Sequence, residues 1–223
     1  GLDVPSGGGP LELDALVAFL QSPCRAFVRV RLGLYLEPVG EAAVVREPLV
    51  LGGLEAWALG ARLLDEAADG LDLDAAMARE RAAGRLPPGV LGELAFAEAA
   101  AKAARVHAAF ARPGAPSPSP SAARSIDLLV GGQRIVGQVD GAGPAGYDAA
   151  QFGAIKARHE LALWVRHLAL CASADAAGLG PQRSRLVGRD GQAVAFGHVA
   201  RAAERLAGLV EWWRRGQALP LPL

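Results

Sequence analysis

Apolar residues recur at three- and four-residue intervals through the first half of the chain, and this spacing predicts a series of amphipathic helices. The first covers residues 12–21. Ser22-Pro23 then starts a second helix that ends at Gly33, because serine caps a helix N-terminus and proline fits its first position. We expect three more helices, over residues 54–68, from Asp72 or Asp74 to about Gly84, and over residues 91–111.

The pattern changes after residue 112. Residues 113–121 are rich in proline and serine and predict a flexible loop. Two apolar runs follow, at 126–130 and 133–140, and Gly131-Gly132 between them predicts a two-residue hairpin turn. A helix is expected over residues 156–171, packed on that hairpin through Trp164 and Leu168. A second hairpin (183–187 with 192–196) and a last helix (199–217) complete an α+β chain with a small mixed sheet.

The composition narrows the possible functions. Apolar residues make up 52% of the chain, enough for a buried core, and 23 basic residues balance 23 acidic ones. Zero net charge produces no long-range attraction to nucleic acid, which argues against a free-standing DNA-binding protein. Cys24 and Cys171 stand in apolar helical stretches and are expected to be buried thiols of a cytoplasmic protein. No signal peptide or membrane-spanning apolar run is visible, so we expect no membrane partner.

The strongest chemical pattern lies in residues 134–171. A strand ending at Asp140, a Gly- and Pro-rich turn, a second strand at residues 147–152 and a covering helix resemble the scaffold on which PD-(D/E)xK nucleases bind Mg²⁺. The second strand of those enzymes carries an acid that ligates the cation and, two residues later, a lysine that stabilises charge at the phosphate. Here Asp148 supplies an acid, but Ala150 stands at the lysine position. We therefore expect a vestigial site near Asp140 and Asp148, with no catalytic residue, no metal and no cofactor.

Alternatives for these carboxylates stay open. Asp140 is also typical of a solvated turn aspartate. An active nuclease would need its second acid and its lysine from elsewhere, for example from Asp127 and Lys156. The sequence does not indicate zinc, because Leu163 stands where an H-E-x-x-H motif beginning at His159 needs its second histidine. We expect the four histidines at the surface or at helix caps.

Arginines of the second helix form a basic face. Arg25 and Arg29 are one helical turn apart, and Arg31 follows. Such a face contacts phosphate groups, docks another subunit or is simply solvated, and the sequence leaves these three uses open. Arg25, Arg29 and Arg31 are the candidate residues for contact with DNA or with another subunit.

Several segments, in order along the chain, resemble the C-terminal domain of the exodeoxyribonuclease V gamma chain, the RecC family. They are LDALVAFL at 13–20, SPCRAFV at 22–28, RLGLYL at 31–36, LGGLE at 51–55, LWVRHLALCA at 163–172 and GRDG at 188–191. The resemblance spans nearly the whole chain from Leu11. The chain departs from the family at residues 113–121, which look like an insertion, and at 219–223, where it stops earlier than the family's subunit.

The resemblance implies a nuclease-like fold without a working active site, in a non-catalytic subunit of a RecBCD-type helicase–nuclease that processes double-strand DNA ends for recombination. The implied partners are RecB- and RecD-type subunits, with single- and double-stranded DNA in the assembled complex. A module that only docks other proteins is the alternative from a different functional class.

We accordingly expect one domain excised from a larger subunit. Its expected parts are a disordered leader at 1–10, a helical half at 11–112, a flexible loop at 113–121, a nuclease-like sheet with helices at 122–218 and a tail at 219–223.

Overall fold

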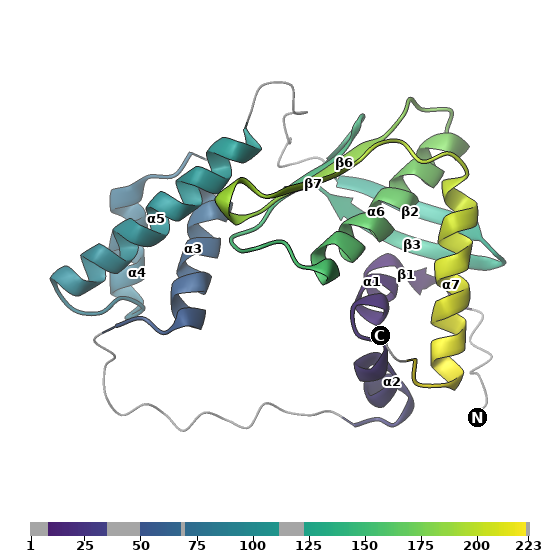
Figure 1. The fold of residues 1–223 in the computed structure, drawn as a ribbon, viewed down its shortest axis with the longest axis horizontal. Helices are drawn as coiled ribbons and strands as arrows, with labels where there is room; N and C mark the ends of the chain where they lie inside the picture. Colours follow the sequence, from purple (N-terminus) through teal and green to yellow (C-terminus); the bar gives the residue numbers. More distant parts are fainter. Residues whose placement is uncertain (1–8, 35–49, 68–69, 112–122, 222–223) are drawn as a thin grey trace.

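The computed structural model describes residues 9–34, 50–67, 70–111 and 123–221 (Figure 1). Within these residues the chain is a mixed α+β structure, as the sequence predicts, but its strands form two small sheets where one was expected. The expected loop at 113–121 and most of the expected leader lie outside the described residues.

The first sheet is built on the hairpin predicted from Gly131-Gly132. Strand β2 (Ala123–Val130) pairs antiparallel with β3 (Gln133–Asp140). Both turn glycines have positive φ angles, 55° and 73°, which residues with a Cβ rarely adopt. Strand β1 (Leu11–Glu12) pairs parallel with β3, so the order is β1-β3-β2. The predicted hairpin of residues 126–130 and 133–140 is confirmed.

The second sheet begins where the first one ends. Gly141, with a φ of 75°, separates β3 from β4 (Ala142–Gly143), and β4 pairs antiparallel with β5 (Gly146–Ala150). The strand that carries Asp148 therefore lies beside the continuation of the strand that ends at Asp140.

Strand β5 pairs parallel with β6 (Arg183–Val187), and β6 pairs antiparallel with β7 (Ala193–Phe196). The turn between β6 and β7 contains a short 3-10 helix, η1 (Arg189–Gly191). The second predicted hairpin is confirmed.

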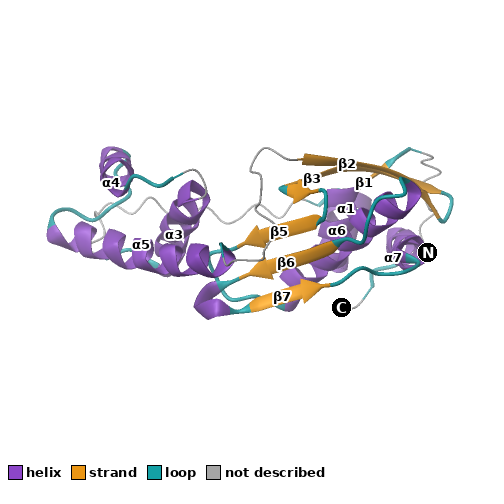
Figure 2. Ribbon diagram, turned by 90° about the horizontal axis from the view of Figure 1, so that it is seen from above, coloured by secondary structure: helices purple, strands orange, loops and turns teal. Residues whose placement is uncertain are grey.

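Helix α6 (Ala157–Ala176) crosses the strands of both sheets, and α1 (Leu13–Gln21) and α7 (Ala202–Ala218) pack against it (Figures 1 and 2). The helix was predicted to end at Cys171, but it continues to Ala176. Gly178, with a φ of 65°, follows its C-terminus, as glycine often does at helix ends. Helix α2 (Pro23–Arg31) follows α1 and touches α7. The first core contains fully buried side chains from the hairpin and these helices, including Leu13, Leu16, Ile126, Ile135, Val165, Leu168 and Leu206.

The two residues expected to hold α6 on the sheet differ in role. Leu168 is fully buried in the first core. Trp164 is only partly buried, and its ring meets Phe196 of β7 edge-on, with the ring centroids 4.9 Å apart. Trp164 thus faces the second hairpin, and Leu168 is the residue at the centre of the core.

Two expectations about single side chains were wrong. His167 is fully buried, because β6 and β7 cover a side of α6 that its sequence alone leaves polar. Its Nε2 lies 2.8 Å from the carbonyl oxygen of Gly197 and its Nδ1 lies 2.9 Å from the hydroxyl of Ser184, so both ring nitrogens have partners. Cys24 is exposed on α2, whereas Cys171 is buried as expected, and both are free thiols.

Helices α3 (Gly53–Ala67), α4 (Leu73–Ala82) and α5 (Val90–Phe110) form a second core at the other end of the molecule (Figure 1). Residues 11–112 are therefore not one packing unit, since α1 and α2 belong with the sheets. Helical periodicity shows which face of a helix is buried but not which partner buries it. No described helix has the length and apolar character required to cross a membrane.

Replacing Leu168 by alanine tests the position of the first core. Removing a fully buried leucine leaves a cavity in the packed interior, so Leu168→Ala should lower the free energy of unfolding by about 2–5 kcal/mol. Leu129→Ala on the exposed face of β2 is the matched control and should change it by less than about 0.5 kcal/mol. Urea unfolding measures both, and equal effects would show that the core has been misplaced.

His167 should make the fold sensitive to acid. Burial lowers the pKa of His167 from its ordinary value of 6.5, so the unfolded chain takes up a proton more readily than the folded chain. Stability should therefore be lost as the pH falls below about 6.5. The variant His167→Gln cannot titrate there, so its free energy of unfolding should fall less steeply than that of the parent in a pH series. Parallel curves for the two proteins would contradict this assignment.

Candidate functional site

Asp140 lies exposed at the end of β3, close to residues from two helices. Burial raises the pKa of the Tyr147 hydroxyl on β5. Among the charges near it, Arg166 lowers this pKa, and Asp140 and Asp14 raise it. Arg166 of α6 and Asp14 of α1 form an ion pair with 2.8 Å between Nη2 and Oδ1. The side chain of Asp140 itself accepts a hydrogen bond from Nε2 of Gln138, on the same face of β3.

Asp148 points the other way. Side chains alternate along a strand, so Tyr147 and Asp148 lie on opposite faces of β5. Asp148 is buried opposite Arg185 of β6, with 3.3 Å between Oδ2 and Nη2. Burial raises the pKa of Asp148, and the charge of Arg185 opposes this shift. The charges that act on Asp148 are those of Arg185 and Arg183, and Asp140 is not among them.

The alternation also shifts the comparison with acid-x-Lys by one residue. The β5 positions on the face of Tyr147 are Tyr147 and Ala149, whereas the sequence comparison used Asp148 and Ala150. Neither Tyr147 nor Ala149 supplies an acid or a lysine. The acid-x-Lys positions of the sequence comparison therefore carry one acid, Asp148, and no lysine.

Asp127, the second acid suggested for an active nuclease, lies apart from Asp140. Asp127 forms a two-pronged ion pair with Arg134 across the β2–β3 hairpin, and this contact lowers the pKa of Asp127. It lies four residues along β2 from Ala123, the partner of Asp140, which corresponds to about 13 Å of strand. Among the residues that the structure describes, no three His, Cys, Asp or Glu side chains cluster as a metal site would require.

The predicted arginine face lines a groove between α1, α2 and the start of α6. The groove has a volume of about 810 Å³, and its charged lining consists of Arg25, Arg29 and Arg158. Arg25 and Arg29 are exposed and one turn apart on α2, as expected. Arg31 is the last residue of α2, and its side chain lies outside the described residues.

Arg158 joins this group only through the tertiary fold. It stands in the first turn of α6, and its carbonyl oxygen accepts a hydrogen bond of 2.9 Å from Nε2 of Gln21, at the end of α1. This contact ties α6 to the helix that precedes Arg25. No periodicity or motif marks Arg158 in the sequence, so sequence reasoning missed it.

His159 completes this end of α6. Its Nδ1 accepts a hydrogen bond of 3.2 Å from the backbone N–H of Lys156, which fits the predicted capping role. Burial lowers the pKa of His159, and the charges of Arg158 and Lys156 lower it further. The neutral form is thereby favoured.

The groove is a local concentration of positive charge in a chain of zero net charge. Three guanidiniums line it, and none of the described lining residues is a carboxylate. The amino end of α6 adds the positive end of the helix dipole. Such a surface suits a phosphate chain or an acidic protein surface.

The contact between α1 and α6 runs from the Asp14–Arg166 ion pair to the arginine groove. Asp14 meets Arg166 near the start of α1, and Gln21 meets Arg158 at its end, so α1 and α6 run antiparallel. Seven residues of helix separate the two contacts along α1, or about 10 Å. The arginine groove therefore lies at the other end of α1 from the Asp14–Arg166 ion pair.

Comparisons with known proteins agree with this arrangement. The family model described as the RecC C-terminal domain matches residues 8–223. The RecBCD enzyme subunit RecC of Escherichia coli (strain K12) is 29% identical over 217 residues, which cover 95% of this chain. The chain spans only 18% of the length of that relative. Because the family model covers nearly all of the chain, the chain belongs to the RecC C-terminal domain family.

Proposed function

We propose that this chain is a non-catalytic structural and DNA-guiding domain of a RecBCD-type helicase–nuclease that processes double-strand DNA ends for recombinational repair. Family membership supports the assignment to such an enzyme. The observation that carries the guiding role is the acid-free groove lined by Arg25, Arg29 and Arg158. Phosphate contacts of this kind position a nucleic acid without reading its sequence.

A PD-(D/E)xK-like fold is part of the proposal. The order of elements supports it: a hairpin (β2–β3), a following strand (β5), a covering helix (α6) and a strand parallel to β5 (β6). Strand β5 lies beside the continuation of β3, as two strands that carry one active site would.

We also propose that the domain has no catalysis of its own. The acid-x-Lys positions of β5 support this, because Ala150 stands two residues after Asp148 where a lysine would be needed. The arginine groove does not use these residues.

The proposal extends to partners and location. In the cell, the domain works in the cytoplasm with RecB- and RecD-type subunits, without a cofactor of its own, and meets single- and double-stranded DNA only within the assembled complex. The zero net charge fits this dependence, because the isolated chain has no long-range field to capture DNA. The expected division into leader, helical half, loop, nuclease-like part and tail remains a proposal of the same kind.

Charge reversal in the groove tests the guiding role. The double variant Arg25→Glu, Arg29→Glu and the single variant Arg158→Glu should each assemble with the partner subunits yet unwind DNA poorly at moderate salt, because each removes phosphate contacts. Arg105→Glu, an exposed arginine of α5, makes the same charge change and should unwind normally. Failure of the groove variants to assemble would instead make the groove a subunit interface.

Binding by the isolated chain should be weak. About three arginines release few counterions, so affinity for single-stranded DNA should fall with salt at a log–log slope of about −2 to −3. Fluorescence anisotropy over a salt series measures the slope, and at physiological salt little binding is expected. Tight binding that salt does not weaken would contradict a domain that depends on its complex.

The chain should not cut DNA. Single- and double-stranded DNA incubated with it and Mg²⁺ or Mn²⁺ should stay intact, because the face of Tyr147 and Ala149 carries no acid and no lysine. Gel electrophoresis of end-labelled DNA measures this. Cleavage that disappears in an Asp140→Asn variant would show an active nuclease.

A further inference from the structure

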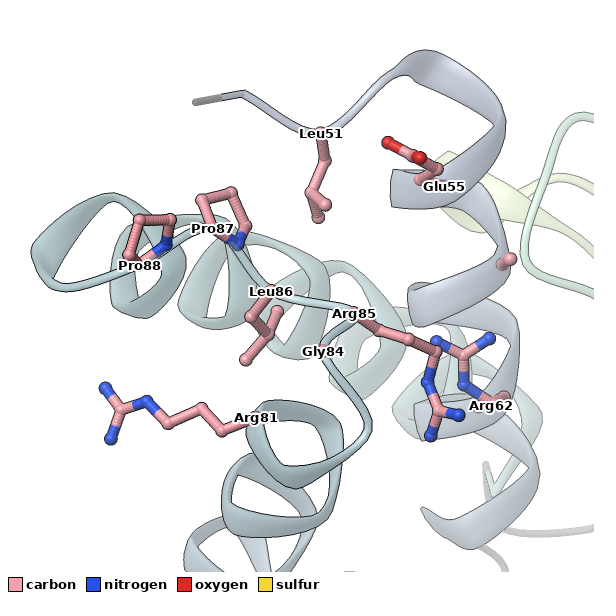
Figure 3. A pocket seen from close by; sticks show the side chains of 10 residues that line it. Leu51, Glu55, Arg62, Arg81, Gly84, Arg85, Leu86, Pro87 and Pro88 are labelled. Atoms are coloured by element: carbon pink, nitrogen blue, oxygen red, sulfur yellow. The ribbon is translucent and has the colours of Figure 1, made fainter. Parts of the chain in front are cut away.

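Two pockets of the described structure differ in how their charges are paired. In the pocket between the start of α3 and the α4–α5 connection, every lining arginine binds a carboxylate, in the pairs Arg62–Glu80, Arg85–Glu80 and Arg81–Glu93 (Figure 3). Glu55 adds a further acid to its lining. In the arginine groove, none of the described lining residues is a carboxylate. The groove is therefore the pocket whose lining favours an anion.

The imidazole of His159, which also lines the groove, has N–H donors at both of its ring nitrogens. Nδ1 lies 3.2 Å from the backbone nitrogen of Lys156 and 2.9 Å from Nε2 of Gln151. On the other side of the ring, Nε2 lies 3.1 Å from Nε of Arg158. A neutral imidazole has one acceptor nitrogen, and the other nitrogen carries the proton. The ring therefore cannot accept hydrogen bonds on both sides.

The partners of Nδ1 determine which nitrogen carries the proton. The backbone N–H of Lys156 can only donate. The amide group of Gln151 also donates, because its Nε2 lies 2.9 Å from the carbonyl oxygen of Ala154, and this contact fixes its orientation. Burial lowers the pKa of His159 from its ordinary value of 6.5, so the ring is neutral at physiological pH. Nδ1 is thus the acceptor, and the proton is on Nε2.

This assignment places two hydrogen-bond donors against each other. The Nε2–H group of His159 and the Nε–H group of Arg158 are neighbours, and neither can accept from the other. An oxygen at hydrogen-bond distance from both nitrogens would satisfy both, and a negatively charged oxygen would form the stronger bonds. Arg158 is exposed, so a ligand in the groove can reach this pair.

The rest of the groove favours a phosphate group as the source of that oxygen. Arg25 of α2 lines the same groove, and a guanidinium binds phosphate oxygens well. A phosphate group has more anionic oxygens than a carboxylate, so it can be bound by the His159–Arg158 pair and by an arginine of α2 together. His159 also stands in the first turn of α6, where the helix dipole stabilises an anion.

We propose that the Nε2–H group of His159 and the Nε–H group of Arg158 together bind a phosphate oxygen, so that His159 binds phosphate as a neutral donor. The inference rests on the phosphate-binding role proposed for the groove and adds to it a residue without charge. A neutral donor releases no counterion. His159 should therefore raise the affinity for a phosphate chain without changing how steeply that affinity falls with salt.

Long-range proton–nitrogen NMR spectra of the imidazole rings test this in the intact chain. At neutral pH the His159 ring should carry its proton on Nε2. Inorganic phosphate and a short oligothymidine should each move its signals saturably, and acetate at the same ionic strength should move them much less. The ring of His167 is the internal control, because both of its nitrogens have protein partners and its signals should stay in place.

Two variants separate the hydrogen bond from the shape of the ring. Glutamine keeps an acceptor for the Lys156 N–H and a donor for the groove, so His159→Gln should bind oligothymidine within about threefold of the parent at low salt. Leucine has neither group, so His159→Leu should bind about tenfold more weakly, with the same log–log salt slope. Fluorescence anisotropy measures both, and thermal melting shows that the variants are folded.

Two further variants serve as controls. His107→Leu makes the same chemical change on α5, outside the groove, and should bind like the parent. Arg25→Gln removes a charge from the groove and should make the salt slope shallower by about one. This contrast distinguishes a neutral donor from a cation.

A proton on Nδ1 would overturn the inference, and so would His159 signals that do not move, equal effects of acetate and phosphate, or equal binding by His159→Leu and the parent. A response to inorganic phosphate but not to oligothymidine would support the site and assign it to a free phosphate. Unwinding by the assembled complex tests the guiding role separately. Normal unwinding by the groove variants, together with a His159 response, would remove the guiding role and leave the phosphate site.

Discussion

The burial of α6 is the constraint on which the rest of the sheet-containing part depends. Val165 and Leu168 are fully buried, and the helix touches both sheets together with α1 and α7. A helix covered on several sides has few orientations that keep every apolar contact, because interiors are close-packed. Its polar residues are therefore fixed as well: Arg158 at the groove, Arg166 beside Asp14, and His167 beneath the second hairpin.

The surroundings of Asp140 and the arginine groove use different residues of the same scaffold. The two sites lie on the same seam between α1 and α6 but draw on different turns of the helices. The Asp140 site depends on the side chains of β5, where one face carries Tyr147 and Ala149. The groove depends on arginines and a helix end, which are unaffected by what β5 carries.

The second core is joined to the sheets by a small number of specific contacts. Phe152, just after β5, packs against Gly60 of α3, where any Cβ would lie 2.1 Å from the ring. Arg185 of β6 donates a hydrogen bond of 2.7 Å to the carbonyl of Phe110, at the end of α5, and its guanidinium lies over the Phe110 ring. These contacts fix α5 at one end. The start of α3 and the α4–α5 connection, at the opposite end of the bundle, face away from the sheets (Figure 1).

The sequence by itself determined the local elements of this protein. Gly131-Gly132 specified a hairpin, Ser22-Pro23 started a helix, and the apolar spacing of α6 identified Leu168 as core, because each depends on neighbouring residues alone. The order of segments also identified the RecC family. Only the tertiary structure decided the rest. Period-two alternation along β5 places Asp148 on the face opposite Tyr147, and packing between distant helices brings Arg158 to Arg25. Packing between elements that are distant in the sequence also buries His167 and divides the helices between two cores. The apolar pattern of a helix shows that one of its faces is covered, but it does not show which element covers that face.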